Sequence, residues 1–352
     1  MAEGAIQAGC RFYAGYPITP QNEIPAYMAK RMPQAGGVFI QAESELAAIN
    51  MVFGASAAGE RAMTSSSSPG ISLKQEGISY IAGAELPAVI VNVMRGGPGL
   101  GNIWPAQSDY FQATRSGGHG DYRSIVLAPS SVQEAYDFMP LAFDLADKYR
   151  GPVIILSDGM LGQMMEPLLV QSPKFKVQSK DMRHAACGMP PKEWALTGCK
   201  GRTPNIIKSF YLKEGDLEKF NLTLQKKYKV IQQKEQRWES LFLDDAKIIV
   251  VAYGTMARIV KSAMGKLRAE GKKVGMIRPI VLWPFPADVF KRIAHSAKAG
   301  RAFLVIEMSY GQMLEDVRLA VEGKAKVEFL GRAGGGIPSE EEIIKKISRL
   351  VR

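Results

Sequence analysis

Glu45 is the residue of this sequence with the clearest chemical potential, because it opens a segment with almost no polar face. The Ala-rich, largely apolar run 46–59 predicts a helix that is buried on all sides. The preceding segment 38–41 reads as a short buried strand. Burying a carboxylate costs free energy unless it has a partner. Two interpretations are open, a capping glutamate beside the helix dipole and a buried acid used in catalysis.

The segments around Glu45 predict the scaffold that must position it. Residues 1–168 alternate short apolar strands with helices, which is typical of a doubly wound parallel α/β sheet. Ligands of such sheets bind beyond the carboxyl ends of the strands. Four unusual loops are expected at those ends, and they favour the catalytic interpretation of Glu45 because they bring a hydroxyl, a carboxylate, a serine cluster and an arginine to one edge. The loops cover residues 16–19, 43–45, 65–70 and 95–99.

The rest of the chain predicts two further parts. Residues 169–245 are rich in Lys and Gln, and we expect an arm for subunit contacts whose main element is a charged helix over 217–240. Strand and helix alternate again over 246–352, which indicates a second, smaller α/β domain. The loop over 95–123 is long for a compact domain, and such loops are usually functional.

Composition narrows the class of protein. No run of about 18 apolar residues predicts a transmembrane helix. Cys10, Cys187 and Cys199 are few and widely spaced, which predicts a reducing cytoplasm and no iron–sulfur cluster held by this chain alone. The net charge of +11 comes with interleaved acids and no aromatic-interleaved basic motif, so an acidic protein partner is favoured over nucleic acid.

Nucleotide and metal motifs are weak. The glycines of segment 95–101 do not open a helix directly, as a dinucleotide loop requires, and no Walker A motif occurs. The histidines are too far apart in sequence for a His-based metal site, so no metal ligand is assigned to this chain. A non-catalytic α/β subunit that holds an ordinary nucleotide in the glycine loop stays open as an alternative.

Four motifs together resemble the pyrimidine-binding domain of 2-oxoacid:ferredoxin oxidoreductases. They are Tyr16-Pro17-Ile18-Thr19-Pro20, Glu43-Ser44-Glu45, Thr64-Ser65-Ser66-Ser67-Ser68-Pro69-Gly70 and Met94-Arg95-Gly96-Gly97-Pro98-Gly99. The resemblance runs over nearly the whole chain. It implies an alpha subunit in which a thiamine-diphosphate-binding-type domain precedes a transketolase C-terminal-like domain.

The resemblance also implies roles for single residues. Glu45 matches the glutamate that contacts thiamine diphosphate and is the expected catalytic residue, and its apolar surroundings would keep that carboxyl dry. Thr19 and Arg95 match residues that bind the substrate carboxylate, for which a guanidinium offers a bidentate fork. Further contacts with the cofactor are expected from Tyr16, Pro17, Ser68 and Gly96.

The expected site is only half complete. Thiamine enzymes commonly hold magnesium with Gly-Asp-Gly and a later asparagine, whose hard oxygen ligands suit Mg²⁺. Here Ser157-Asp158-Gly159 lacks the first glycine, and no asparagine follows before Asn205. The resemblance therefore implies a beta subunit with the diphosphate and Mg²⁺ site, a gamma subunit, a ferredoxin-like iron–sulfur subunit and an external ferredoxin.

The implied reaction is oxidative decarboxylation of a 2-oxoacid with coenzyme A to acyl-CoA and CO₂, with ferredoxin reduced. Segments 194–202 and 97–102 resemble branched-chain enzymes more than 2-oxoglutarate enzymes. We therefore expect 2-oxoisovalerate as substrate, with 2-oxoglutarate as the alternative.

Overall fold

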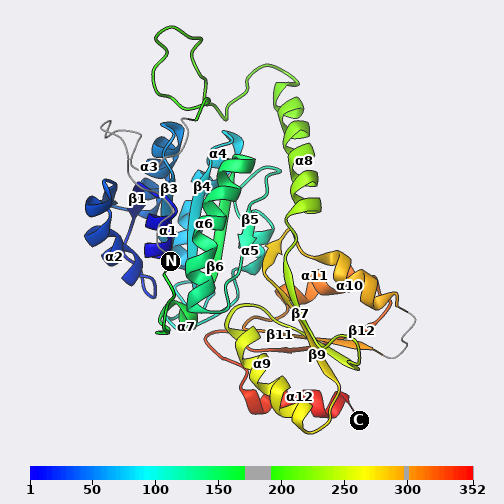
Figure 1. Ribbon diagram of the computed structural model, residues 1–352. Coiled ribbons are helices and arrows are strands. Elements are labelled where there is room, and N and C mark those ends of the chain that lie inside the picture. The colour runs from blue at the N-terminus through cyan, green and yellow to red at the C-terminus, as the bar shows by residue number, and fades with distance from the viewer. Residues whose placement is uncertain (171–191, 297–300, 352) are drawn as a thin grey trace.

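Two sheets organise the chain. The computed structural model describes residues 1–170, 192–296 and 301–351. A seven-stranded sheet forms the first half, and a five-stranded sheet forms the second (Figure 1). Among the described residues, no helix has both the length and the apolar character needed to span a membrane.

The larger sheet confirms the predicted α/β pattern. Its strands run in the order β10-β5-β6-β4-β3-β1-β2, all parallel except β10, which pairs antiparallel with β5. The inner strands β3, β4 and β6 are buried along their whole length, as expected of parallel strands covered on both faces. The strands of this sheet are β1 Phe12–Gly15, β2 Val38–Gln41, β3 Ala62–Ser66, β4 Ala88–Met94, β5 Ile125–Leu127, β6 Pro152–Asp158 and β10 Val281–Trp283.

Helices follow these strands as the sequence predicts. Helix α3 packs against α4, and α1 packs against α6. Ser44 and Ser131 accept hydrogen bonds from the first turns of α3 and α6, which fixes where each helix begins. The helices are α1 Ala2–Gln7, α2 Glu23–Arg31, α3 Glu45–Ala57, α4 Ser68–Gly83, α5 Tyr110–Thr114, α6 Val132–Tyr149 and α7 Gly159–Gly162, with a 3-10 turn at Pro33–Ala35.

Two sequence predictions about the surroundings of Glu45 were wrong. Strand β2 is not buried, because it lies at the edge of the sheet and Val38 is half exposed. Helix α3 is not buried on all sides either, since Leu46 is 45% exposed and Asn50 is also open. This region therefore carries more apolar side chains than the chain buries.

The arm differs from its predicted form. Helix α8 covers Asp216–Lys234, and the predicted helix over 217–240 is wrong beyond Lys234 because β7, Trp238–Leu241, pairs antiparallel with β9. Three apolar residues of α8 are buried against the chain, and Tyr228 packs its ring on Trp283. The part of the arm over 171–191 lies outside the described residues.

The smaller sheet has the order β12-β11-β8-β9-β7. The predicted domain boundaries at residues 168 and 245 stay a prediction. Two strands pair with the sheet on the other side of these boundaries. Strand β7 lies in the predicted arm but joins the second sheet, and β10 follows β9 in sequence but joins the first. The remaining elements are β8 Ile248–Val251, β9 Val274–Pro279, β11 Ala302–Glu307, β12 Lys326–Gly331, α9 Gly254–Ala269, α10 Ala287–Ala294, α11 Gln312–Val321 and α12 Glu340–Leu350.

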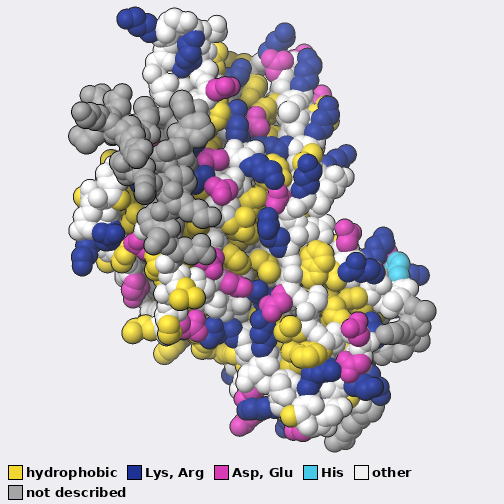
Figure 2. Space-filling model, in the orientation of Figure 1, with side chains coloured by type: hydrophobic (Ala, Val, Ile, Leu, Met, Phe, Trp, Pro, Cys, Tyr) yellow, Lys and Arg dark blue, Asp and Glu magenta, His cyan; other side chains and the backbone are white. Residues whose placement is uncertain are grey.

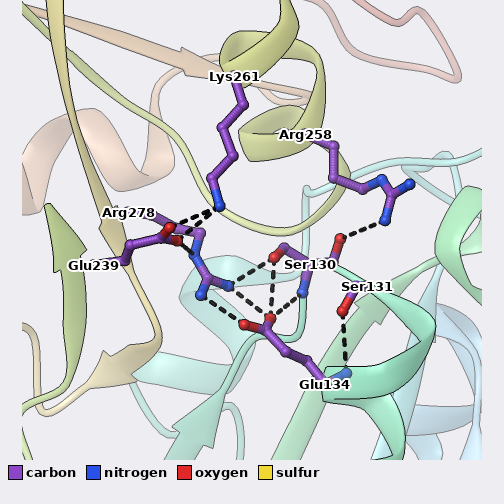
Figure 3. A network of polar contacts seen from close by, with 7 residues as sticks. All are labelled: Ser130, Ser131, Glu134, Glu239, Arg258, Lys261 and Arg278. Carbon is purple, nitrogen blue, oxygen red and sulfur yellow. Dashed lines mark hydrogen bonds and ion pairs between the residues drawn. The ribbon is translucent and has the colours of Figure 1, made fainter. Parts of the chain in front are cut away.

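A buried polar network joins the two sheets, and Arg278 of β9 is its centre (Figure 3). The guanidinium forms a fork with both Glu134 carboxylate oxygens of α6, at 2.7 Å each. It also donates to Glu239 of β7 at 2.8 Å and to the Ser130 hydroxyl at 2.8 Å. Burial raises the pKa of the Glu134 carboxyl, but the hydrogen bonds and charge of Arg278 outweigh this and hold that pKa below its ordinary value.

We predict that Arg278→Met lowers the free energy of unfolding by about 1–3 kcal/mol, because it removes the charge-assisted hydrogen bonds that Arg278 donates to two partly buried carboxylates. Urea unfolding of the purified chain measures this. Arg258→Met is the matched control, since Arg258 joins the same network at its open side, where ion pairs contribute about 0–1 kcal/mol. Equal stability of the two variants would show that Arg278 does not hold the domains together.

Candidate active site

The four loops predicted to share one edge do lie beyond the carboxyl ends of neighbouring parallel strands. Thr19 follows β1, Glu45 follows β2, and Arg95 follows β4, while Ser66 is the last residue of β3. The parallel registers β2–β1–β3–β4 bring these ends to the same side of the sheet. The topology therefore gathers a hydroxyl, a carboxylate, serines and a guanidinium as the sequence indicates.

Glu45 is the first residue of α3 and is only 6% exposed. Among the described residues, no side chain donates a hydrogen bond to its carboxyl group or forms an ion pair with it. Gly70 of α4 lies directly against this carboxyl, since a Cβ at Gly70 would come within 2.7 Å of Glu45 Oε1 and would also collide with the Ser66 hydroxyl. Only glycine at position 70 therefore allows the Glu45 carboxyl and the Ser66 hydroxyl to pack this closely against α4.

Lys74 is a second buried charged group at this site, and the sequence analysis missed it. Its side chain is fully buried on α4, one turn beyond Gly70, and its Nζ donates to the backbone oxygen of Glu45 at 3.2 Å. Burial lowers the pKa of Lys74 to about 8, and the charge of Glu45 opposes this only in part. The available signal was a lysine in a helix whose neighbouring residues on that face are isoleucine and glycine.

The structure brings Arg95 and Thr19 together. Arg95 is almost fully buried, and its guanidinium donates to the backbone oxygen of Thr19 at 2.8 Å and to that of Leu100 at 3.2 Å. These bonds fix the orientation of the side chain. Its Nε is buried without a hydrogen-bond partner among the described residues. A guanidinium has five N–H donors, so Arg95 keeps donors for a bound carboxylate.

The other predicted contacts have different surroundings. The Ser68 hydroxyl donates to Asp109 at 2.6 Å and accepts from the Arg95 backbone N–H at 3.0 Å, so it links α4 to the arginine loop. Burial raises the pKa of Asp109, although hydrogen bonds from Ser68 and Asn92 oppose this. Tyr16 and Pro17 are exposed on the loop after β1. The roles of these residues and of Gly96 in binding a cofactor stay predictions.

Several buried hydroxyl groups at this edge lack partners among the described residues. They are those of Thr64, Ser66 and Ser67, on β3 and just after it. A buried polar group without a hydrogen bond is costly, so each such group in a native structure requires an explanation. Together with Glu45 and Arg95 they indicate a polar molecule bound at this edge.

Asp158 does not contribute to a metal site in this structure. Its carboxylate accepts from the Thr255 hydroxyl at 2.7 Å and from the N–H groups of Met160 and Leu161 at 3.1 Å. Burial raises the pKa of Asp158 against these hydrogen bonds. Within residues 1–170, 192–296 and 301–351, no cluster of three or more His, Cys, Asp or Glu residues could hold a metal ion.

The residues around this edge leave apolar side chains open to solvent. Leu46 of α3 and Leu73 of α4 are exposed, and the loop after Arg95 exposes Leu100, Ile103 and Trp104. Large exposed apolar side chains that gather on one surface are typical of interaction or ligand sites. Helices α3 and α4 and the arginine loop thus carry apolar groups that the described residues do not cover.

Known proteins match the chain over both halves. Residues 3–202 match the family described as pyruvate flavodoxin/ferredoxin oxidoreductase, thiamine diphosphate-binding, and residues 246–343 match pyruvate:ferredoxin oxidoreductase core domain II. Ketoisovalerate oxidoreductase subunit VorB of Methanothermobacter marburgensis is 51% identical, over 99% of this chain and 94% of the relative. The 2-oxoglutarate synthase subunit KorA of the same organism is 39% identical, over 98% and 96%.

Solved structures agree with this match. The 2-oxoglutarate:ferredoxin oxidoreductase from Magnetococcus marinus, which has 2-oxoglutarate, coenzyme A and succinyl-CoA bound, superposes with a TM-score of 0.81 at 28% identity. The alignment covers all of this chain and 64% of that one. A split-gene transketolase superposes with a TM-score of 0.60 at 13% identity, which shows similarity of fold alone.

We predict that Lys74→Met raises the free energy of unfolding of the chain at pH 7 by about 2–3 kcal/mol, because it removes a buried charge. The lowered pKa means that the folded state binds this proton less tightly than the unfolded state. The gain should be full below pH 8 and should disappear as the pH rises from about 8 to the ordinary value of 10.5.

Urea unfolding of the isolated chain at several pH values measures this gain. Lys30→Met, at an exposed position of α2, is the control and should change little at any pH. A gain that does not depend on pH, or a loss of stability at pH 7, would contradict the burial of a charged Lys74.

Proposed function

Because the chain belongs to the 2-oxoacid:ferredoxin oxidoreductase family, we propose that it contributes the pyrimidine-contacting half of a thiamine diphosphate site in an enzyme for branched-chain 2-oxoacids. The observation that carries this proposal is the buried Glu45 carboxyl, which packs against Gly70 and accepts no hydrogen bond from the described residues. A polar ring nitrogen of a bound cofactor would supply that partner.

The residues at the edge fit this half of the cofactor. Thiamine diphosphate, when bound, supplies the carbon that attacks the keto group and accepts the charge left by decarboxylation. Glu45 would hold a proton at N1′ of the aminopyrimidine, and its burial would keep water away from that contact. Gly70 allows the Glu45 carboxyl to approach α4, and the hydroxyls of Ser66 and Ser67 have hydrogen-bonding capacity to offer.

Arg95 and Thr19 would bind the carboxylate that all 2-oxoacids share. Arg95 is already oriented by two backbone oxygens, so little side-chain freedom is lost when its remaining N–H groups bind a carboxylate. The Thr19 hydroxyl accepts a hydrogen bond from Asn22 at 3.4 Å and can donate its own proton. These two residues would set affinity for the class of substrate.

The open apolar surface at this edge supports partner subunits that complete the site. Leu46, next to Glu45 on α3, and Leu73, next to Lys74 on α4, are exposed in this chain, as an interface residue would be before assembly. In this proposal a beta subunit supplies the diphosphate and Mg²⁺ ligands. A gamma subunit and a ferredoxin-like iron–sulfur subunit complete the complex, in which coenzyme A takes the acyl group and an external ferredoxin takes the electrons.

The arm supports the same assembly. Lys and Arg side chains gather over α8 on the face shown in Figure 2. The segment before this helix exposes Ile206, Phe210 and Leu212. A basic helix beside exposed apolar side chains suits a partner surface with acidic and apolar groups. We therefore assign subunit contacts to the described part of the arm, residues 192–245.

A branched-chain substrate is favoured over 2-oxoglutarate by the loop after Arg95. Leu100, Ile103 and Trp104 are apolar, and a second carboxylate buried there would have no cation from this loop. Arg332 belongs to the second-domain loop whose Gly335 contacts Trp104, and its guanidinium is paired with Glu342 at 3.4 Å. The 51% identity with the ketoisovalerate enzyme subunit, against 39% with the 2-oxoglutarate one, supports the same choice.

The alternative of a nucleotide-binding scaffold finds no support in the glycine loop. The N–H of Gly96 donates to the Trp104 oxygen at 2.9 Å, and the Gly96 oxygen accepts from Asn102 at 3.0 Å. A phosphate-binding loop needs free N–H groups directed at the ligand. This loop instead closes on itself.

We predict that the complete complex oxidises 2-oxoisovalerate with a kcat/KM at least about tenfold above that for 2-oxoglutarate, because each buried CH₂ contributes about 0.8 kcal/mol and the second carboxylate lacks a partner. A substrate panel with a low-potential electron acceptor measures this. Arg95→Ala should lower kcat/KM for both substrates by a similar factor. A preference for 2-oxoglutarate would overturn the substrate assignment, and turnover independent of thiamine diphosphate would overturn the function.

A further inference from the structure

We propose that the second domain influences substrate selectivity by supporting the loop after Arg95. The supporting contact, called the brace below, comes from outside the pyrimidine-binding half. The brace is the loop of residues 332–336, which follows β12. It holds the substrate loop, residues 96–104, through Asn102 and Trp104. The inference rests on the proposed function. It adds that the second domain positions the loop that would contact the substrate side chain.

The substrate loop is a closed unit with Asn102 at its centre. The Asn102 backbone N–H donates to the Gly96 oxygen at 3.0 Å, and the Asn102 side-chain oxygen accepts from the Trp104 N–H at 3.0 Å. A bridge between Arg95 and Pro105 closes the base of the loop. The side-chain amide of Asn102 therefore controls the internal shape of the loop and leaves its NH₂ group for an outside partner.

That outside partner is the second domain. Asn102 Nδ2 donates to the backbone oxygen of Gly334 at 2.9 Å, across 232 residues of sequence. Gly335 then packs directly on Trp104, because a Cβ at Gly335 would lie 2.6 Å from the Trp104 Cβ. Real Cβ contacts are not this short, so only glycine at 335 allows the two loops to approach.

The segment that follows Trp104 is held by the same domain. Gln107 exchanges backbone and side-chain hydrogen bonds with Met308, at 2.9 and 3.0 Å. Its side-chain N–H group also donates to the Tyr253 oxygen at 2.9 Å. The Tyr110 hydroxyl donates to Asp316 of α11 at 2.6 Å. From Asn102 to Tyr110 the backbone is therefore positioned from the second domain.

Packing of side chains within the substrate loop cannot replace this brace. Leu100, Ile103 and Trp104 are 81%, 57% and 64% exposed, so packing of these side chains contributes little to the position of the loop. The Arg95 guanidinium is anchored on the first domain through the Thr19 oxygen at 2.8 Å, and it has a longer contact of 3.2 Å with the Leu100 oxygen of the substrate loop. A disturbed brace should therefore change recognition of the substrate side chain more than recognition of its carboxylate.

The test compares two neighbouring glycines in the complete complex. Gly334 and Gly335 have φ values of +64° and +90°, so alanine strains the backbone at both. Only at 335 does the added methyl group meet Trp104, whereas at 334 no atom lies within 4 Å. The measured quantity is the ratio of kcat/KM for 2-oxoisovalerate to that for pyruvate, whose side chain is a single methyl group.

We expect Gly335→Ala to lower this ratio by about tenfold, the effect typical of one misplaced methylene in an apolar pocket. Gly334→Ala should leave the ratio within about twofold of the wild type. Asn102→Asp is a second probe, because it removes the donor to Gly334 and keeps the acceptor for the Trp104 N–H. It should lower the ratio even if the Gly335 variant does not assemble.

An unchanged ratio in both Gly335→Ala and Asn102→Asp would overturn the brace, and so would an equal loss for both substrates, which indicates a merely structural role. Failure of the proposed function has a different signature. In that case the wild-type complex itself would show no thiamine-dependent turnover of either 2-oxoacid.

Discussion

The carboxyl group of Glu45 is the constraint on which the organisation of this edge depends. It is buried at the start of α3, and the described part of the chain provides no hydrogen bond for it. A buried carboxylate without hydrogen bonds is unfavourable, which supports the proposal that a group from outside this chain binds there. Ser44 fixes where α3 begins, Gly70 allows the carboxyl to approach α4, and Lys74 adds a second buried charge that donates to the Glu45 backbone oxygen.

The second domain also supports this edge of the first sheet. Arg278 joins the sheets through Glu134 and Glu239, and strand β10 extends the first sheet with residues of the second half. The loop that carries Arg95 then runs along the second domain from Asn102 to Tyr110. The acid is thus positioned by the first domain alone, whereas the substrate loop is positioned by both. In the proposed function, this division would give the cofactor contact and recognition of the substrate side chain separate structural supports.

Local patterns predicted the parallel strands and the four loops at one edge, because each depends on residues close in sequence. They did not predict β7 and β10, since strands of three or four residues at a sheet edge are determined by distant pairing partners. Lys74 was missed because its burial depends on the contact of α4 with α3. The exposure of Leu46 was missed for a related reason, as the apolar pattern also encodes surface that a partner subunit can cover.

Turnover of the complete complex with Glu45→Gln tests the role of this buried acid most directly. Glutamine fills the same space but cannot hold an acidic proton at the cofactor. The predicted result is a loss in kcat on the order of 10²–10⁴, with the complex still assembled in size-exclusion chromatography. Wild-type turnover in an assembled Glu45→Gln complex would contradict it and would leave Glu45 as a residue at the start of a helix.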